Sequence, residues 1–211
     1  MKIPKGLIVS VQVELGSAFS QGEDIVKFCK EAVRGGCVGL RLCGSYNVRM
    51  VKKYIKVPII GLTKSSFSDG TVYITPTYED AIELIHSGAD FVAMDATNRC
   101  KYKELEKATN QGNIIGDISN FKEALVAIES GCCALTTALS GYTSDCNKQT
   151  EPDYSLVHEL VESFPSIPIL AEGRYWENSQ VKKAFNLGAY SVVVGSAISR
   201  PHLITERLGR T

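Results

Sequence analysis

A lysine and a glutamate each follow a short apolar run, a position from which both could take part in proton transfer. Lys64 comes at the end of the run 59–64, and Glu172 follows the run 167–171. Partial desolvation would lower the pKa of the amine and raise the pKa of the carboxyl group. If they face each other across a sugar-sized gap, they suit removal and return of a proton at a carbon next to a carbonyl. A structural salt bridge is the alternative.

Glycines and basic residues in the last part of the chain could bind a phosphate. Gly173 and Arg174 follow one apolar run, and Gly195 and Ser196 follow the next, with Arg200 shortly after. Backbone N–H groups of a glycine turn that leads into a helix form an anion site. We expect a phosphate site here, and the alternative is that these glycines serve only as tight turns.

Further polar side chains stand where apolar runs end, and they are candidates for substrate binding. Gln12, Arg41, Asp95 and Asp117 hold such positions. A buried unpaired charge is costly, so Arg41 and Asp117 either pair with each other or bind substrate groups. Asp95 either does the same or caps the turn that follows it. Tyr142 is the aromatic residue that we expect near a ligand.

Histidine and cysteine placement argues against a metal or disulfide framework. His86, His158 and His202 all fall within or at the start of expected helices, whereas barrel metalloenzymes place such ligands at strand ends. The seven cysteines form no C-x-x-C pair, so reduced thiols are expected. We therefore expect no metal.

Composition narrows the class of protein further. Lys+Arg and Asp+Glu both count 23 in 211 residues, so the chain lacks the basic excess typical of nucleic-acid binding. No apolar stretch approaches the ~20 residues needed to span a bilayer. The N-terminal residues carry no signal-peptide pattern. These features predict a cytoplasmic protein without nucleic-acid or membrane partners.

Alternating apolar and helical segments predict the elements that must position these residues. Runs that are apolar on both faces are typical of buried parallel strands, and helical stretches lie between them. A glycine ends the helix before several strands, for example Gly88, Gly131 and Gly188, and the spacing from Pro58 to Asn113 equals that from Asn113 to Pro168. We expect one (β/α)8 TIM barrel over residues 1–211, rather than an open doubly wound sheet. The expected strands are 7–11, 38–42, 57–62, 91–94, 113–118, 132–138, 167–171 and 190–194.

Motifs along nearly the whole chain resemble the N-acetylmannosamine-6-phosphate 2-epimerases of bacterial amino-sugar and sialic acid catabolism. The combination of Y-I-T-P-T, S-G-Y-T and E-G-R runs is more specific than any one of them. The segments that match in order and spacing are 7–12, 36–41, 58–64, 72–77, 94–97, 116–119, 136–143, 171–174 and 194–201.

The resemblance implies reversible epimerisation at carbon 2 of N-acetylmannosamine 6-phosphate in a phosphate-binding barrel without an organic cofactor. Lys64 and Glu172 then correspond to the proton-transfer pair, and Arg41 and Asp117 to substrate-orienting groups. The backbone of Gly173, Gly195 and Ser196, with Arg200, corresponds to the phosphate cradle. The resemblance also implies an amino-sugar phosphate as the small-molecule partner and a homodimeric state.

Two loops and one further residue depart from the family pattern, and that residue is Ser196, which stands where a second glycine is common. Ser65, Ser66 and Phe67 stand where many relatives carry a basic residue and a tyrosine, and 98–101 replaces an arginine-proline continuation but keeps Arg99. The alternatives are another phosphate-binding barrel enzyme, such as a sugar-phosphate epimerase or decarboxylase, and a non-catalytic sugar-phosphate sensor. A sensor would have little reason to keep both Lys64 and Glu172.

Overall fold

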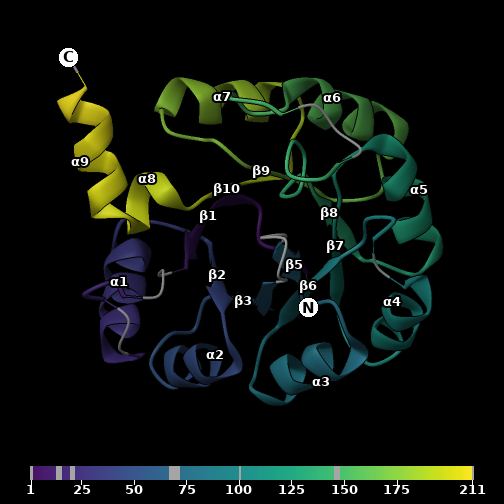
Figure 1. Ribbon diagram of the computed structural model, residues 1–211, viewed down its shortest axis with the longest axis horizontal. Helices are drawn as coiled ribbons and strands as arrows, with labels where there is room; N and C mark the ends of the chain where they lie inside the picture. The colour runs from purple at the N-terminus through teal and green to yellow at the C-terminus, as the bar shows by residue number, and fades with distance from the viewer. Residues whose placement is uncertain are drawn as a thin grey trace.

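Eight parallel strands close into a barrel, and helices surround it (Figure 1). The computed structural model describes residues 2–12, 16–19, 22–66, 72–99, 101–144 and 148–210. The strand order around the barrel is β1-β10-β9-β8-β7-β6-β3-β2, so the first strand pairs with the last, as in Val9 opposite Val194. The barrel strands are β1 (Gly6–Val11), β2 (Gly39–Cys43), β3 (Ile59–Leu62), β6 (Phe91–Asp95), β7 (Ile114–Asp117), β8 (Ala134–Thr136), β9 (Ile169–Glu172) and β10 (Ser191–Val194).

The predicted (β/α)8 barrel is confirmed, with every expected strand present within a few residues of its predicted bounds. The helices that connect and follow the strands are α1 (Gly22–Arg34), α2 (Ser45–Lys52), α3 (Tyr78–His86), α4 (Tyr102–Thr109), α5 (Phe121–Glu129), α6 (Tyr154–Ser163), α7 (Asn178–Asn186), α8 (Ser196–Ser199) and α9 (Pro201–Gly209). None of the helices in these described stretches is both long and apolar enough to cross a membrane.

Apolar residues on both faces of each strand build two layers of core. Ile8, Ile60, Phe91, Ile115 and Leu170 belong to a cluster contributed by alternate strand positions that face the barrel interior. Their neighbours along each strand pack outward against the helices in a larger cluster. Because both faces are buried, the strands read as continuous apolar runs rather than as alternating patterns.

Glycine ends four of the helices, as predicted, and returns the chain to the barrel. Gly36, Gly88, Gly131 and Gly188 have φ angles of 93°, 96°, 91° and 93°, in the left-handed region that favours glycine. Each donates its amide to a carbonyl three residues earlier, and the next residue donates to one five residues earlier. This paired arrangement is the Schellman motif, which satisfies the last carbonyls of the helix.

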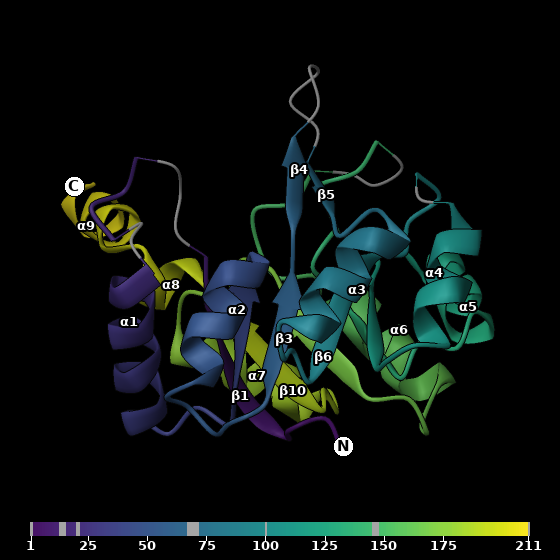
Figure 2. The ribbon, with the colours of Figure 1, turned by 90° about the horizontal axis from the view of Figure 1, so that it is seen from below.

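A two-stranded antiparallel hairpin rises above the carboxyl end of the barrel strands (Figure 2). It consists of β4 (Lys64–Ser66) and β5 (Val72–Ile74) and was not predicted from the sequence. Lys64, predicted to end the third strand, instead begins β4, because β3 ends at Leu62. Phe67, Cys100 and Cys146, which entered the sequence predictions, lie outside the described residues.

Candidate active site

A cavity of about 900 Å³ opens at the carboxyl end of the barrel strands. Its volume lies in the range of pockets that enclose small molecules. Ten of the twelve candidate residues line it, and the exceptions are Asp95 and Asp117, which are both fully buried. The ten are Gln12, Arg41, Lys64, Tyr142, Glu172, Gly173, Arg174, Gly195, Ser196 and Arg200.

Lys64 reaches this cavity from the first residue of the hairpin. Its side chain stays accessible, but the surrounding walls limit its hydration, and this desolvation lowers the pKa of Lys64. The positive charges of Arg200 and Arg41 act in the same direction, whereas Cys43 and Glu172 oppose the shift. The pKa of the Lys64 amine is thus displaced toward neutral pH, which favours its use as a base in proton transfer compared with a surface lysine.

Glu172 is the last residue of β9, and its side chain is only 14% exposed. Burial raises the pKa of Glu172 to about 7, with Asp117 adding to the shift and Arg41 opposing it. Thr137 holds the backbone at this position from both sides, since its hydroxyl donates to the Glu172 carbonyl and accepts from the Glu172 amide. Near neutral pH the carboxyl group can therefore either accept or donate a proton.

Arg41 and Asp117 pair with each other, as one of the two alternatives from the sequence predicted, and the substrate contact stays a prediction. Arg41 Nη2 lies 2.5 Å from Asp117 Oδ2, and Arg41 Nη1 lies 3.2 Å from Asp117 Oδ1. The same Nη1 lies 3.2 Å from Glu172 Oε2. Burial opposes the charge of Arg41, but these two carboxylates outweigh it and raise the pKa of the guanidinium. Arg41 is therefore a fixed cation beside Glu172.

Asp95 stabilises a loop and does not line the cavity. It accepts hydrogen bonds from the amide and the hydroxyl of Thr97, which is the turn-capping alternative, and its other oxygen lies 2.8 Å from Arg99 Nη2. Arg99 in turn stacks on the ring of Tyr73, 4.5 Å from its centroid. Arg99 and Tyr73 both line the cavity, and the sequence prediction assigned neither a role. In the sequence, the Y-I-T-P-T run and the retained Arg99 of loop 98–101 pointed to this region.

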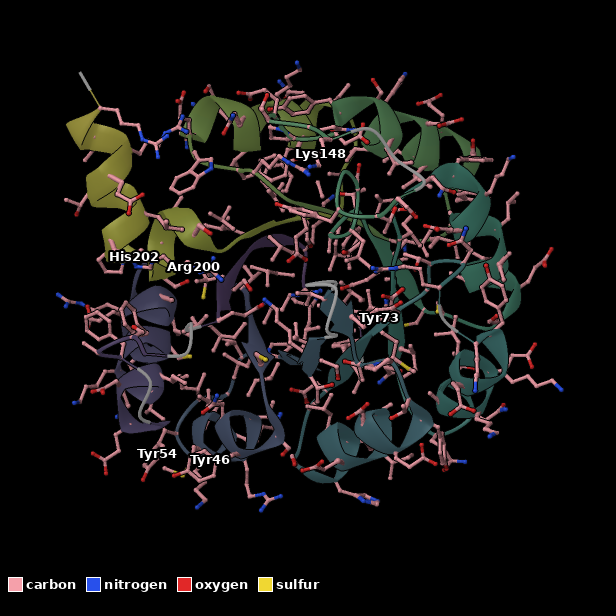
Figure 3. All side chains as sticks on the ribbon, in the orientation of Figure 1. Tyr46, Tyr54, Tyr73, Lys148, Arg200 and His202 are labelled. Atoms are coloured by element: carbon pink, nitrogen blue, oxygen red, sulfur yellow. The ribbon has the colours of Figure 1, made fainter. Side chains whose placement is uncertain are left out.

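The loops after β9 and β10 form one wall of the cavity. Gly195 caps α8 and lies beside β1, since a Cβ added there would be in ordinary van der Waals contact with the Cβ of Ser10, at 3.4 Å. Arg200 donates through Nε to the Gln12 carbonyl at 3.5 Å. Figure 3 places Arg200 on the side of the barrel mouth away from Tyr73. Backbone amides and a cation thus converge at one end of the cavity.

Arg174 is engaged by the neighbouring loop rather than free at this wall. Its Nη2 donates to the Ser140 carbonyl at 2.8 Å, and its guanidinium lies 4.4 Å from the centroid of the Tyr142 ring. Gly141 makes room for this contact, because a Cβ there would lie 2.3 Å from Arg174 Nη2. The predicted phosphate contact of Arg174 stays a prediction, and the structure gives this residue a loop-bracing contact that sequence alone did not indicate.

No group of three or more metal-ligating side chains occurs among the residues that the structure describes. Of the seven cysteines, the five described are free, and Cys29, Cys37 and Cys132 are buried in the core. The residues that line the cavity supply an amine, a carboxyl group, guanidinium groups, hydroxyl groups and backbone amides.

Comparisons with known proteins agree with this arrangement. Residues 25–210 match the family described as "Putative N-acetylmannosamine-6-phosphate epimerase". A relative named "Putative N-acetylmannosamine-6-phosphate 2-epimerase" from Clostridioides difficile (strain 630) is 40% identical over 98% of this chain and 95% of its own. One of the same name from Caldanaerobacter subterraneus is 38% identical over 98% of this chain and 90% of its own.

The fold also matches solved structures, one of which is an epimerase of this family. The N-acetylmannosamine-6-phosphate 2-epimerase from Clostridium perfringens superposes with a TM-score of 0.89 at 33% identity, covering 96% of this chain and 91% of that one. A structure titled "Native KDPGal structure" has a TM-score of 0.66 at 15% identity and shares the fold alone. From its barrel, its cavity and these matches, the chain belongs to the N-acetylmannosamine-6-phosphate epimerase family.

Proposed function

We propose that this protein is an epimerase that interconverts N-acetylmannosamine 6-phosphate and N-acetylglucosamine 6-phosphate. The observation that carries the proposal is the placement of Lys64 and Glu172 in one cavity, with pKa values displaced toward each other by their surroundings. Family membership supports the substrate class. A sensor would need the phosphate-binding end of the cavity but not this pair.

Proton transfer at carbon 2 follows from the chemistry of the substrate. The carbon 2 proton becomes acidic when the sugar ring opens and carbon 1 is an aldehyde. One member of the pair removes this proton, the electron pair moves into an enolate, and the other member delivers a proton to the opposite face. Lys64 and Glu172 exchange these roles in the reverse reaction, so each must reach one face of carbon 2.

Arg41 stabilises the charge that develops during this step. Asp117 and Glu172 hold its guanidinium in place on two sides, and its side chain is only 2% exposed. A fixed donor that does not have to reorganise is effective at stabilising a developing oxyanion. We therefore assign Arg41 to the enolate oxygen, and Asp117 to orienting Arg41.

The phosphate binds at the wall made by the loops after β9 and β10. Glycine backbone at Gly173 and Gly195, the amide of Ser196 and the cation of Arg200 all line the cavity there. The Gln12 carbonyl accepts from Arg200, Gln12 lines the cavity with it, and Tyr142 lines the cavity from the loop after β8. Phosphate bound at this wall leaves the remaining cavity, with Lys64 and Glu172, for the sugar carbons.

We also propose a cytoplasmic location and a homodimeric state. The buried free cysteines suit a reducing compartment. Helix α9 has no buried residue and leaves Leu208 80% exposed, which suits a surface covered by a second copy. Sedimentation velocity of the purified protein tests the dimer, and a monomer at micromolar concentration would contradict it.

Proton NMR of the purified protein with N-acetylmannosamine 6-phosphate, in the presence of EDTA, tests the proposed activity. We expect the signals of N-acetylglucosamine 6-phosphate to grow until the two epimers reach equilibrium. No conversion, with binding of the sugar phosphate shown by calorimetry, would identify a sensor. No conversion and no binding would indicate a different sugar phosphate as substrate.

A further inference from the structure

Thr75, next to the hairpin that carries Lys64, has a backbone conformation that its residue type disfavours. Its φ angle is 44°, in the left-handed region, and its side chain is completely buried. A β-branched residue is a genuine outlier there, because its Cβ crowds the backbone. Such a conformation persists only where the surroundings hold it, and it is found preferentially at functional sites.

Two hydrogen bonds to Thr63 hold Thr75 in this conformation. The Thr75 amide donates to the Thr63 carbonyl at 3.1 Å, and the Thr63 amide donates to the Thr75 hydroxyl at 3.0 Å. Lys64 is opposite Ile74 in the hairpin, so Thr63 and Thr75 form the next pair along. A hydrogen-bonded pair in an antiparallel ladder normally exchanges two backbone bonds. Here the hydroxyl takes the place of the Thr75 carbonyl.

The hairpin is fixed on both sides of this pair. Ile74 is 6% exposed and belongs to the same core cluster as Leu62, the last residue of β3. One residue further out, Tyr73 stacks under Arg99, which the buried Asp95 holds. Figure 3 shows Tyr73 directed over the barrel mouth. The junction between β3 and β4 is therefore the point that determines where Lys64 leaves the barrel.

We infer that Thr75 is a positioning residue for Lys64: its hydroxyl locks the Thr63 backbone and so directs the neighbouring amine into the cavity. This inference rests on the proposed role of Lys64 in proton transfer. Thr75 does not line the cavity, so its effect on turnover passes through the Thr63–Lys64 backbone and not through substrate contact. The strained φ angle is maintained because it brings the hydroxyl to the Thr63 amide.

Substituting Thr75→Val tests this role, since valine keeps the β-branched shape and removes only the hydroxyl. We expect kcat to fall about 10- to 100-fold, because small displacements of a catalytic group have effects of this size, while KM for the sugar phosphate stays close to that of the wild type. Thr75→Ser keeps the hydroxyl and should restore most of kcat. If the valine variant does not fold, Thr75→Ala carries the same prediction.

Thr77→Val is the matched control from the same segment. The Thr77 hydroxyl accepts from the Asp80 amide at the start of α3, so this variant also loses one side-chain-to-backbone hydrogen bond but leaves Lys64 untouched. Its kcat should equal that of the wild type. A folded Thr75→Val or Thr75→Ala enzyme with wild-type kcat would overturn the inference, as would equal losses in Thr75→Val and Thr77→Val. An inactive wild type would instead overturn the proposed function.

Discussion

Replacing Asp117 by asparagine tests whether the buried ion pair behind the cavity holds Arg41 in place. Asp117 is fully buried and makes two contacts to the Arg41 guanidinium, at 2.5 and 3.2 Å. Asparagine keeps one acceptor oxygen but no charge, which leaves Glu172, 3.2 Å from Nη1, as the charged partner of Arg41 among the described residues.

The structure sets the size of the expected effect. Removing one member of a buried pair costs about 3–5 kcal/mol, and the remaining contact to Glu172 places Asp117→Asn near the lower end. For a chain of this length, a loss of about 3 kcal/mol lowers the Tm by about 6–12 °C. Thermal unfolding, followed by circular dichroism, measures this change in Tm. Glu31→Gln, in the exposed Arg34–Glu31 pair, should cause no measurable loss and serves as the control.

The same variant also changes the acid–base behaviour of the cavity. The charge of Asp117 raises the pKa of Glu172, so its removal lowers that pKa. In the reaction direction that uses Glu172 as the base, the acid limb of the kcat profile should therefore move to lower pH.

The double variant Arg41→Met/Asp117→Asn removes the poorly paired cation and should be more stable than Asp117→Asn alone. A Tm of Asp117→Asn within 2 °C of the wild type would refute the reasoning.

Three further predictions concern the cavity walls. In the wild type, activity in the direction that uses Glu172 as the base should fall as the pH drops through its pKa of about 7, and a limb near pH 4 in the measured profile would contradict this. Arg200→Ala should raise KM for the sugar phosphate about 10- to 100-fold with a smaller change in kcat, as steady-state kinetics would show, because it removes a charged hydrogen bond. Gly141→Ala should raise KM about tenfold, because the added Cβ would lie 2.3 Å from Arg174 Nη2 and would displace the hydrogen bond from Arg174 to the Ser140 carbonyl. An unchanged KM would show that this hydrogen bond does not contribute to substrate binding.

Sequence predicted those parts of the fold that local physics determines. Gly88, Gly131 and Gly188 predict the ends of three helices, because few other residues accept the left-handed backbone conformation with which the chain returns to the barrel. Strands that are buried on both faces can be predicted because they form continuous apolar runs in the sequence. Expected strand ends made Lys64 and Glu172 candidates, since the carboxyl ends of parallel strands meet at one face, and both residues line the cavity.

The remaining features depend on contacts between residues far apart in the chain. Arg174 contacts Ser140, 34 residues away, and nothing local distinguishes this arginine from a phosphate ligand. Pairing of Arg41 with Asp117 was one of two alternatives, and only the fold places them within hydrogen-bond distance. The hairpin of β4 and β5 was missed because each strand has only three residues, too few for a periodic pattern.

Transfer of hydrogen at carbon 2 is the central claim, and its direct test is proton NMR of the reaction in heavy water. For the wild type, we predict that the product carries deuterium at carbon 2, because the residue that delivers hydrogen to the opposite face carries deuterium taken from the solvent. Lys64→Ala should lose both the conversion and the exchange that Lys64 performs, with the fold intact. A product that keeps its original carbon 2 proton, or a Lys64→Ala enzyme that epimerises at the wild-type rate, would contradict the account.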